Sequence, residues 1–178
     1  MKEKETEVEI TEDSDVFHVK VDGQTTDELH NDIPQDIQDL YDVNDLNIEV
    51  VVSDDIVQDS KEKIAERVST DGQTISRIFD ISILVACQDE QVGTINETSQ
   101  KLKFMVDIPI EDLKYDVDTI NREFVILREH ENIVEEIPVE VVDGQAIFET
   151  NKFSTYALVY RDTPKKLLNN ISKSNIKT

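Results

Sequence analysis

The sequence has no tryptophan, a single cysteine and only four glycines among its 178 residues. The lone Cys87 excludes an internal disulfide, and its apolar neighbours in "SILVACQ" predict a buried thiol rather than a reactive nucleophile. The glycines lie too far apart to form a phosphate-binding loop. No apolar run reaches the roughly 18 residues of a membrane span, and the opening "MKEKETEVEI" lacks the apolar core of a signal peptide.

Positive charge is also scarce. Lys and Arg number 18 against 40 Asp and Glu, which gives a formal net charge of -22 at pH 7. Such a surface repels phosphate backbones and anionic lipids, so we expect neither nucleic-acid binding nor membrane-surface binding. We expect the same charge to keep the chain soluble and monomeric, and we predict no cofactor.

The apolar residues that are present are mainly Val, Ile and Leu, and several segments alternate them with polar residues. Branched side chains and a period of two favour β-strands. In the segments 74–88 and 153–160 both faces are apolar, which predicts central strands. The strands are expected within residues 6–10, 16–22, 46–53, 74–88, 100–109, 122–130, 137–150 (a hairpin around Asp143 and Gly144) and 153–160.

Two segments have a helical pattern. In "DSKEKIAERVS", Asp59 is the expected N-cap, Glu62 completes a capping box, and Ile64 and Val68 form an apolar pair four residues apart; Gly72 ends the helix. A second, short helix is expected to open at Pro34, with Ile37, Leu40 and Tyr41 on one side.

The predicted fold class is therefore mainly β: an antiparallel β-sandwich, immunoglobulin-like, with one or two short helices. The length suits one domain, or one domain and a smaller companion. We divide the chain into three parts. Residues 1–58 form an N-terminal β-rich segment of the same domain or of a small companion domain, residues 59–163 a β-sandwich module, and residues 164–178 a flexible tail.

Paired acidic residues are the most frequent candidates for a functional site, because their carboxylates could bind a cation. A Ca²⁺ ion needs about six or more converging oxygens, and no acidic run here has the Asp-x-Asp-x-Asp-Gly spacing that supplies them locally. A site would have to join two loops. The candidates for it are Asp54, Asp55, Asp116 and Asp118.

Evidence for catalysis is slight. His18, His30 and His130 have no partner at metal-ligand spacing, and no serine lies on a G-x-S-x-G elbow. Ser154 and Thr155 lie inside a predicted strand, where pleated packing or cross-strand bonding is their expected role. An internal Lys–Asn amide crosslink would need a lysine, an asparagine and an acid buried together, and the sequence identifies no such trio.

The segment "FETNKFSTYALVYRDT" resembles the closing strand of a domain that recurs in long surface proteins of Gram-positive Firmicutes. The segments "FDISILVACQDEQVGTINETSQKLKFMVDIP" and "NREFVILREHENIVEEIPVEVVDGQAIFE" resemble its preceding strands, and together the likeness covers residues 60–163. The chain departs from the pattern at Asn151, where Asp is usual, and at Glu129 and Glu131, which flank His130.

This resemblance implies an extracellular β-sandwich at the cell wall, used as a non-enzymatic structural or adhesive module, a stalk or spacer unit. Its partners would be the neighbouring domains of a parent surface protein. Three alternatives stay open: a module that binds Ca²⁺, a glycan or a host protein; more remotely, a hydrolase; and, for the compartment, the cytoplasm. A glycan platform is disfavoured because there is no tryptophan and the phenylalanines are mostly predicted to face inward.

Overall fold

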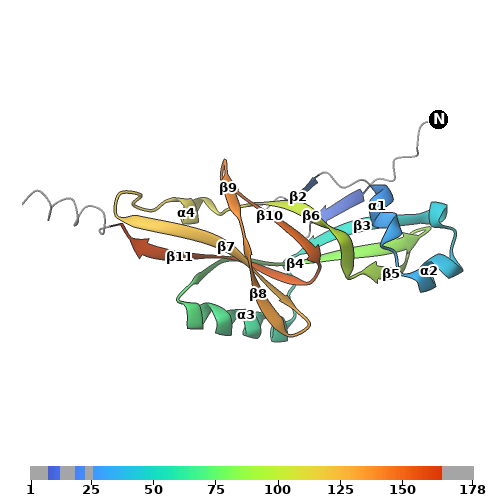
Figure 1. Ribbon diagram of the computed structural model, residues 1–178, viewed down its shortest axis with the longest axis horizontal. Coiled ribbons are helices and arrows are strands. Elements are labelled where there is room, and N and C mark those ends of the chain that lie inside the picture. The colour runs from blue at the N-terminus through green and yellow to red at the C-terminus, as the bar shows by residue number, and fades with distance from the viewer. Residues whose placement is uncertain (1–7, 13–18, 23–25, 166–178) are drawn as a thin grey trace, which may run out of the picture.

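The computed structural model describes residues 8–12, 19–22 and 26–165 (Figure 1). The sequence places Phe17 and His18 on opposite faces of the strand expected within residues 16–22, and a turn at Gly23. These three residues lie outside the described ones. Of the predicted tail, only Pro164 and Lys165 are described, and Pro164 belongs to the last strand.

The chain is mainly β, as predicted, and its strands form two sheets whose arrangement is compatible with a β-sandwich. The immunoglobulin-like topology stays a prediction. Pairing is antiparallel except between β1 and β3, which run parallel. The larger sheet has the order β1 (Val8–Glu12), β3 (Leu46–Ser53), β4 (Thr74–Cys87), β11 (Thr155–Pro164), β7 (Ile120–His130), β8 (Ile133–Pro138), with β5 (Glu90–Ile95) also pairing with β4. The smaller sheet has the order β2 (Val19–Asp22), β6 (Glu97–Asp107), β10 (Gln145–Lys152), β9 (Glu140–Val142).

Short helices connect these strands: α1 (Thr26–Asn31), α2 (Gln35–Leu40), the 3₁₀ turn η1 (Val43–Asp45), α3 (Gln58–Asp71) and α4 (Ile110–Leu113). Pro34 is the N-cap of α2, as expected, and Ile37 is buried. The predicted common face was wrong, however, because the helix ends at Leu40, which is 78% exposed, and Tyr41 follows in an extended conformation. The sequence did not predict α1.

The predicted cap of α3 was also wrong. The helix begins before Asp59, and its N-cap is Val57, which makes no side-chain capping bond. Asp59 instead lies in the first turn and pairs with Lys63 at 2.8 Å. The predictions of its buried face and its end are confirmed: Ile64 and Val68 are buried, and Gly72 ends the helix in the left-handed conformation at φ 65°, which glycine adopts without steric cost.

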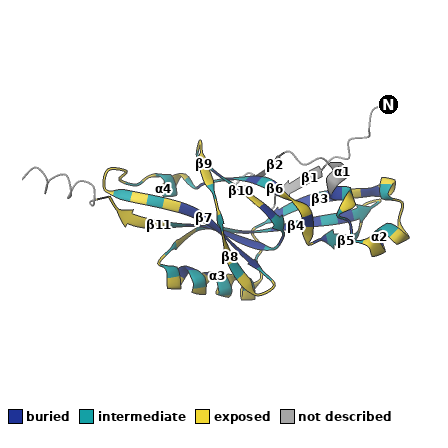
Figure 2. Ribbon diagram, in the orientation of Figure 1, coloured by how far each residue is buried: buried dark blue, intermediate teal, exposed yellow. Residues whose placement is uncertain are grey.

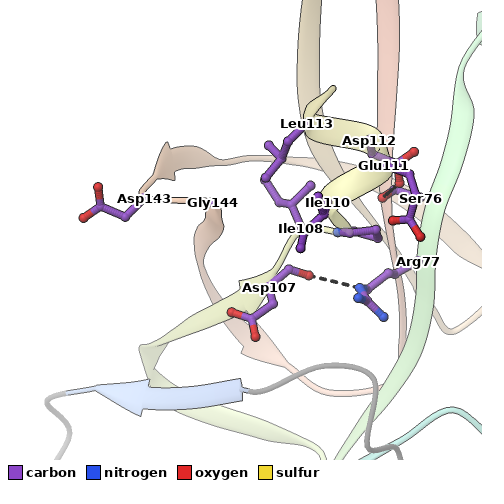
Figure 3. Close-up of a pocket in the computed structure, with 11 residues that line it drawn as sticks. Ser76, Arg77, Asp107, Ile108, Ile110, Glu111, Asp112, Leu113, Asp143 and Gly144 are labelled. Carbon is purple, nitrogen blue, oxygen red and sulfur yellow. Dashed lines mark hydrogen bonds between the residues drawn. The ribbon is translucent and has the colours of Figure 1, made fainter. Parts of the chain in front are cut away.

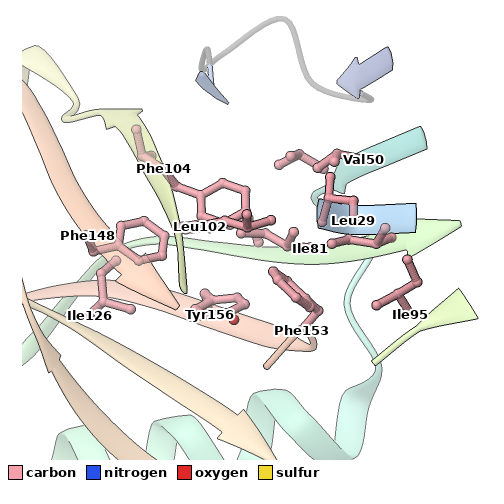
Figure 4. Close-up of a cluster of buried hydrophobic side chains, with 14 of the residues drawn as sticks. Leu29, Val50, Ile81, Ile95, Leu102, Phe104, Ile126, Phe148, Phe153 and Tyr156 are labelled. Atoms are coloured by element: carbon pink, nitrogen blue, oxygen red, sulfur yellow. The ribbon is translucent and has the colours of Figure 1, made fainter. Parts of the chain in front are cut away.

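The main hydrophobic core lies between the two sheets (Figure 4). Its centre is aromatic: Phe104 and Phe148 from the smaller sheet stack at 5.7 Å, and Phe79 and Tyr156 from the larger sheet stack at 5.9 Å. Residues from before residue 58 belong to the same core, among them Leu29 and those of β3. The boundary placed at residue 58 therefore crosses one sheet and one continuous core.

A second core lies on the outer face of the larger sheet, where α3 packs against β7 and β11 (Figure 1). It joins Ile64 and Val68 of the helix to Leu127, Ala157 and Val159 of the strands. Over its first five residues β11 is therefore buried on both faces, whereas its outer end is exposed (Figure 2), and the strand lies between β4 and β7. The predicted central position of this strand is confirmed, as is that of β4 between β3 and β11.

The chain passes from the smaller to the larger sheet at Phe153 and Ser154. The sequence predicted one strand from Phe153 to Tyr160, but β10 ends at Lys152 and β11 begins at Thr155. In one continuous strand, Phe153 would share a face with Ala157 and Val159, opposite Tyr156, and this prediction was wrong. Because of the break, Phe153 packs with Tyr156 in the main core, 6.2 Å from the ring of Phe104.

Cys87 is only partly buried, so the prediction of a buried thiol was wrong in degree. It ends β4, and the next two residues, Gln88 and Asp89, form a tight turn with positive φ. A strand end beside a hairpin turn is more open to solvent than the strand middle.

Candidate functional site

An open pocket of about 810 Å³ lies where β4, the end of β6, α4 and the β9–β10 turn meet (Figure 3). Its carboxylates come from Asp107, Glu111, Asp112 and Asp143, and its one cationic side chain is Arg77. The other lining residues are Ser76, Ile108, Pro109, Ile110, Leu113 and Gly144. The pocket is therefore largely anionic.

Arg77 is the polar centre of this pocket. Its Nε donates a hydrogen bond to the backbone oxygen of Asp107 at 3.0 Å (Figure 3). Burial lowers the pKa of the Arg77 guanidinium, while the nearby carboxylates of Asp107, Glu111 and Asp112 act in the opposite direction. The guanidinium thus compensates part of the negative charge that surrounds it.

Two of the pocket carboxylates have partners in the chain. Gln145 Nε2 donates to Asp107 Oδ1 at 2.8 Å, and the hydroxyl of Ser76 donates to Asp112 Oδ2. A serine that donates to a carboxylate without a histidine beside it lacks the general base of an activated nucleophile. The lining carboxylates are therefore groups that can accept hydrogen bonds from a polar or cationic ligand.

Beside the pocket, Arg122 of β7 connects α4 to the larger sheet, because its Nη1 donates a hydrogen bond to the backbone oxygen of Asp112 at 2.8 Å. Its guanidinium lies 4.0 Å from the ring of Tyr160 and 4.7 Å from that of Tyr115, a cation–π arrangement. It also makes a two-pronged ion pair with Asp162 at 2.7 and 2.8 Å. The hydrogen bond and charge of Arg122 lower the pKa of the Asp162 carboxyl.

A buried polar network connects the two sheets. Arg128 of β7 donates to Thr150 of β10 at 2.9 Å and to the carboxylate of Glu135 on β8. The Thr150 hydroxyl also lies 3.0 Å from the Tyr156 hydroxyl, which donates to the backbone oxygen of Lys152. Burial raises the pKa of Tyr156 well above its ordinary value, so the phenol stays neutral in the folded protein.

A third cluster lies on the surface between α3 and the β7–β8 turn. The ammonium of Lys63 donates to Asn132 Oδ1 and to Asp59 Oδ2, and it lies 3.8 Å from Glu129 Oε1. Glu129 is nearly buried, and it accepts hydrogen bonds from Ser60 Oγ and from the Asn132 backbone N–H, both at 3.2 Å. The structure thus brings together a lysine, an asparagine and an acid, which the sequence did not place together. Of the three, only Glu129 is buried, so the cluster does not have the full burial that the sequence analysis set as a requirement.

The four candidate calcium ligands lie in two separate loops. Asp54 and Asp55 follow β3 and are exposed. Asp116 and Asp118 precede β7, where Asp116 Oδ1 accepts the Asp118 backbone N–H at 3.0 Å. Within residues 8–12, 19–22 and 26–165, no three His, Cys, Asp or Glu side chains come together as a metal-binding group. The loop-to-loop calcium site is therefore not assembled among these residues.

The described histidines and the strand hydroxyls have local partners. His30 Nε2 lies 3.2 Å from the backbone oxygen of Leu46, and His130 Nε2 lies 4.0 Å from Glu131. Ser154 donates to the backbone oxygen of Glu129 on the neighbouring strand, and Thr155 donates to Asp80 at 3.3 Å. Of the two predicted roles, cross-strand bonding is the one that these hydroxyls have, although Ser154 lies just before β11 and not inside a strand.

Comparison of the chain with protein-family models, with curated proteins and with solved structures found no significant match. Among the helices that the structure describes, none has the length and apolar character needed to cross a membrane.

Proposed function

We propose that this chain is a non-enzymatic structural module of a bacterial surface protein, a stalk or spacer unit whose partners are its neighbouring domains. The observation that carries this proposal is the position of β11. The strand is paired along all ten residues with β7 and along its first half with β4. It is also apolar and buried on both faces over its first five residues.

The direction of β11 in the elongated molecule adds to this argument. The strand ends at one extremity of the long axis, whereas β1 and α1 lie in the opposite half (Figure 1). A pull along that axis would load the hydrogen bonds of both ladders together, instead of opening them one after another. Such a geometry favours resistance to force, which a stalk unit needs.

The resemblance of residues 60–163 to a Firmicutes surface domain supports the same proposal, and with it an extracellular, cell-wall location. The compartment can be tested on intact cells of the source organism. Brief protease treatment of whole cells should cleave this protein and spare a cytoplasmic marker. Protection of the protein until the cells are lysed would contradict the surface location.

Single-molecule pulling tests the mechanical role. The chain would be placed between reference domains of known unfolding force in one polyprotein. We expect a single unfolding peak at or above the reference force, because β11 is held by two strands and two cores. Leu158→Ala should lower this force, since Leu158 is fully buried in the main core, whereas Ile133→Ala, at a 59% exposed position, should not. Extension without a force peak would contradict the proposal.

The acidic pocket supports a second candidate function, a binding module for a cation or another polar ligand. Four carboxylates line this pocket around one guanidinium. Melting with and without millimolar CaCl₂ tests it, because a ligand that binds only the folded state must raise the melting temperature. A shift that is lost in Asp107→Asn and Asp112→Asn but kept in Asp54→Asn would place the ion in this pocket. No shift would exclude the calcium version.

A further inference from the structure

The cluster between α3 and the β7–β8 turn has the components of an amide-forming reaction. The Lys63 side chain carries a primary amine and donates to Asn132 Oδ1. That oxygen is bonded to the carboxamide carbon, Cγ, so the amine lies beside the carbon that it would attack. We propose that Lys63 and Asn132 form an intramolecular isopeptide bond, with Glu129 as the group that transfers the proton.

Glu129 has the position that this role requires. Its side chain is only 9% exposed, and Oε1 lies 3.8 Å from Lys63 Nζ. The same oxygen accepts the backbone N–H of Asn132 at 3.2 Å, and Ser60 holds the other oxygen. The carboxylate is therefore held next to both reacting residues. Its distance of 3.8 Å from Nζ exceeds the roughly 2.6–3.2 Å of direct proton transfer, so the transfer needs a side-chain shift of less than about 1 Å or one bridging water.

The reaction balances without any other reagent. The neutral amine of Lys63 attacks Cγ of Asn132, and a new C–N bond forms. Glu129 accepts a proton from Nζ and returns it to Nδ2, the Cγ–Nδ2 bond breaks, and ammonia leaves. The chain loses the mass of one ammonia molecule, about 17 Da, and one positive charge.

The rate of crosslink formation depends on the fraction of Lys63 whose amine is uncharged. The hydrogen bond from Lys63 to Asp59 is the largest influence that raises the pKa of the amine, and the charges of Asp59 and Glu129 add to it. Only a small neutral fraction reacts at pH 7, and this fraction grows as the pH rises. Loss of ammonia makes the step irreversible, and positioned groups can react with effective molarities of about 10⁵–10⁸ M, so even a small neutral fraction accumulates product.

The bond would connect residues 69 positions apart and hold α3 permanently over the second core. It does not depend on a role at the cell surface. The crosslink can form in a chain that unfolds without a force peak, and a force peak can occur in a chain that has no crosslink. The two experiments therefore test the two proposals independently.

Intact-mass measurement of the purified full chain tests the proposal, before and after incubation for days at pH 7 and at about pH 9. We expect a species lighter by one ammonia, formed faster at the higher pH. Trypsin should then release residues 62–67 joined to residues 129–152. An unchanged mass after incubation at the higher pH would overturn the proposal. A lighter chain without the joined peptide would also overturn it, because an asparagine succinimide has the same mass.

Three variants serve as controls. Lys63→Arg keeps the charge near Asp59 and Glu129 but removes the amine. Asn132→Gly keeps the positive φ of 69° at this turn position but removes the carboxamide. Both should fold, with an unchanged circular dichroism spectrum, and keep the full mass. Glu129→Gln should slow the reaction at least tenfold. Formation of the joined peptide at the normal rate in Glu129→Gln would overturn the role of the carboxylate.

Asp59→Asn gives the opposite expectation. It removes the main influence that raises the pKa of Lys63, so the crosslink should form faster at pH 7 than in the unchanged chain. A slower reaction in this variant would overturn the account of the charge on Lys63.

Discussion

At the scale of single residues, the packing of β11 decides which substitutions matter. Leu158 has no exposed surface and belongs to the main core, together with Tyr156 and Phe79. The next residue, Val159, points the other way into the second core. Alternate side chains of one strand therefore stabilise two different interfaces.

Leu158→Ala should lower the free energy of unfolding by roughly 2–5 kcal/mol, because it removes buried methyl groups and leaves a cavity. Urea titration measures this change. The matched control is Ile133→Ala, an aliphatic residue of β8 that is 59% exposed, which should stay within about 0.5 kcal/mol. Equal effects for the two variants would show that β11 is not the central strand.

Tyr156 gives a prediction for alkaline pH. Burial raises its pKa above the ordinary value of 10.0, so the folded state favours the neutral phenol. The stabilisation from Tyr156 is complete below pH 10 and is lost as the pH rises toward the folded-state pKa, because the unfolded chain ionises first. Tyr156→Phe removes this dependence and also a hydrogen bond, at a cost of about 1 kcal/mol.

The measurement is the melting temperature of both proteins between about pH 8 and pH 11. The unchanged chain should be the more stable at pH 8, and the difference should shrink above pH 10. A constant difference over the whole range would mean that the phenol does not titrate differently in the two states.

At the scale of helices and strands, the sequence predicted the elements that show a regular spacing of apolar residues within one segment. It did not predict features that depend on contacts between segments far apart in the chain. The alternation of Ile48, Val50 and Val52 located β3, since one face of that strand lies in the main core. The break between β10 and β11 has no local marker, because Phe153 and Ser154 suit a strand as well as their neighbours do. It arises from the packing of two sheets.

The same difference between local patterns and long-range contacts applies to α1, to the Lys63–Asn132 contact and to the acidic pocket. Leu29, Ile33 and Ile37 are all buried and stand four residues apart, but only Leu29 lies in α1, since Ile33 follows that helix and Ile37 belongs to α2. With a single buried apolar residue, α1 has no periodic pattern of its own that would predict it. No local pattern connects Lys63 with Asn132 either. Their contact depends on how α3 lies across the sheet, and the acidic pocket likewise combines four separate segments.

The contact between α2 and β5 gives a prediction at this scale. A Cβ added at Gly93 of β5 would clash with the side chain of Ile37 on α2. Gly93→Ala should therefore lower the free energy of unfolding by about 1–3 kcal/mol, the usual cost of overpacking.

A double-mutant cycle tests this contact, because Ile37→Ala removes the side chain that would clash. The double variant Gly93→Ala, Ile37→Ala should be more stable than the sum of the single effects predicts, by at least 0.5 kcal/mol. Gly72→Ala is the control for backbone strain alone, since its φ is 65° and nothing lies near the added Cβ. Additive effects of Gly93→Ala and Ile37→Ala would show that α2 does not pack on β5.

At the scale of the whole molecule, the net charge of -22 acts against the fold. Like charges repel most when they are held close together, and salt screens that repulsion. We expect the melting temperature to rise as NaCl increases from about 10 mM to about 500 mM, over which the Debye length falls from about 30 Å to a few Å. A falling melting temperature would mean that ion pairs such as Arg122–Asp162 outweigh the repulsion.

The order in which β11 enters the larger sheet has a consequence for biosynthesis. β4 and β7 are not neighbours; the strand that joins them comes after both in the chain. A nascent chain therefore carries two unpaired, apolar strand edges until residue 164 has left the ribosome. Non-local pairing of this kind folds slowly, and open edges favour aggregation. The larger sheet cannot close before β11 has been synthesised, so these two edges stay open to wrong pairing until the strand is available.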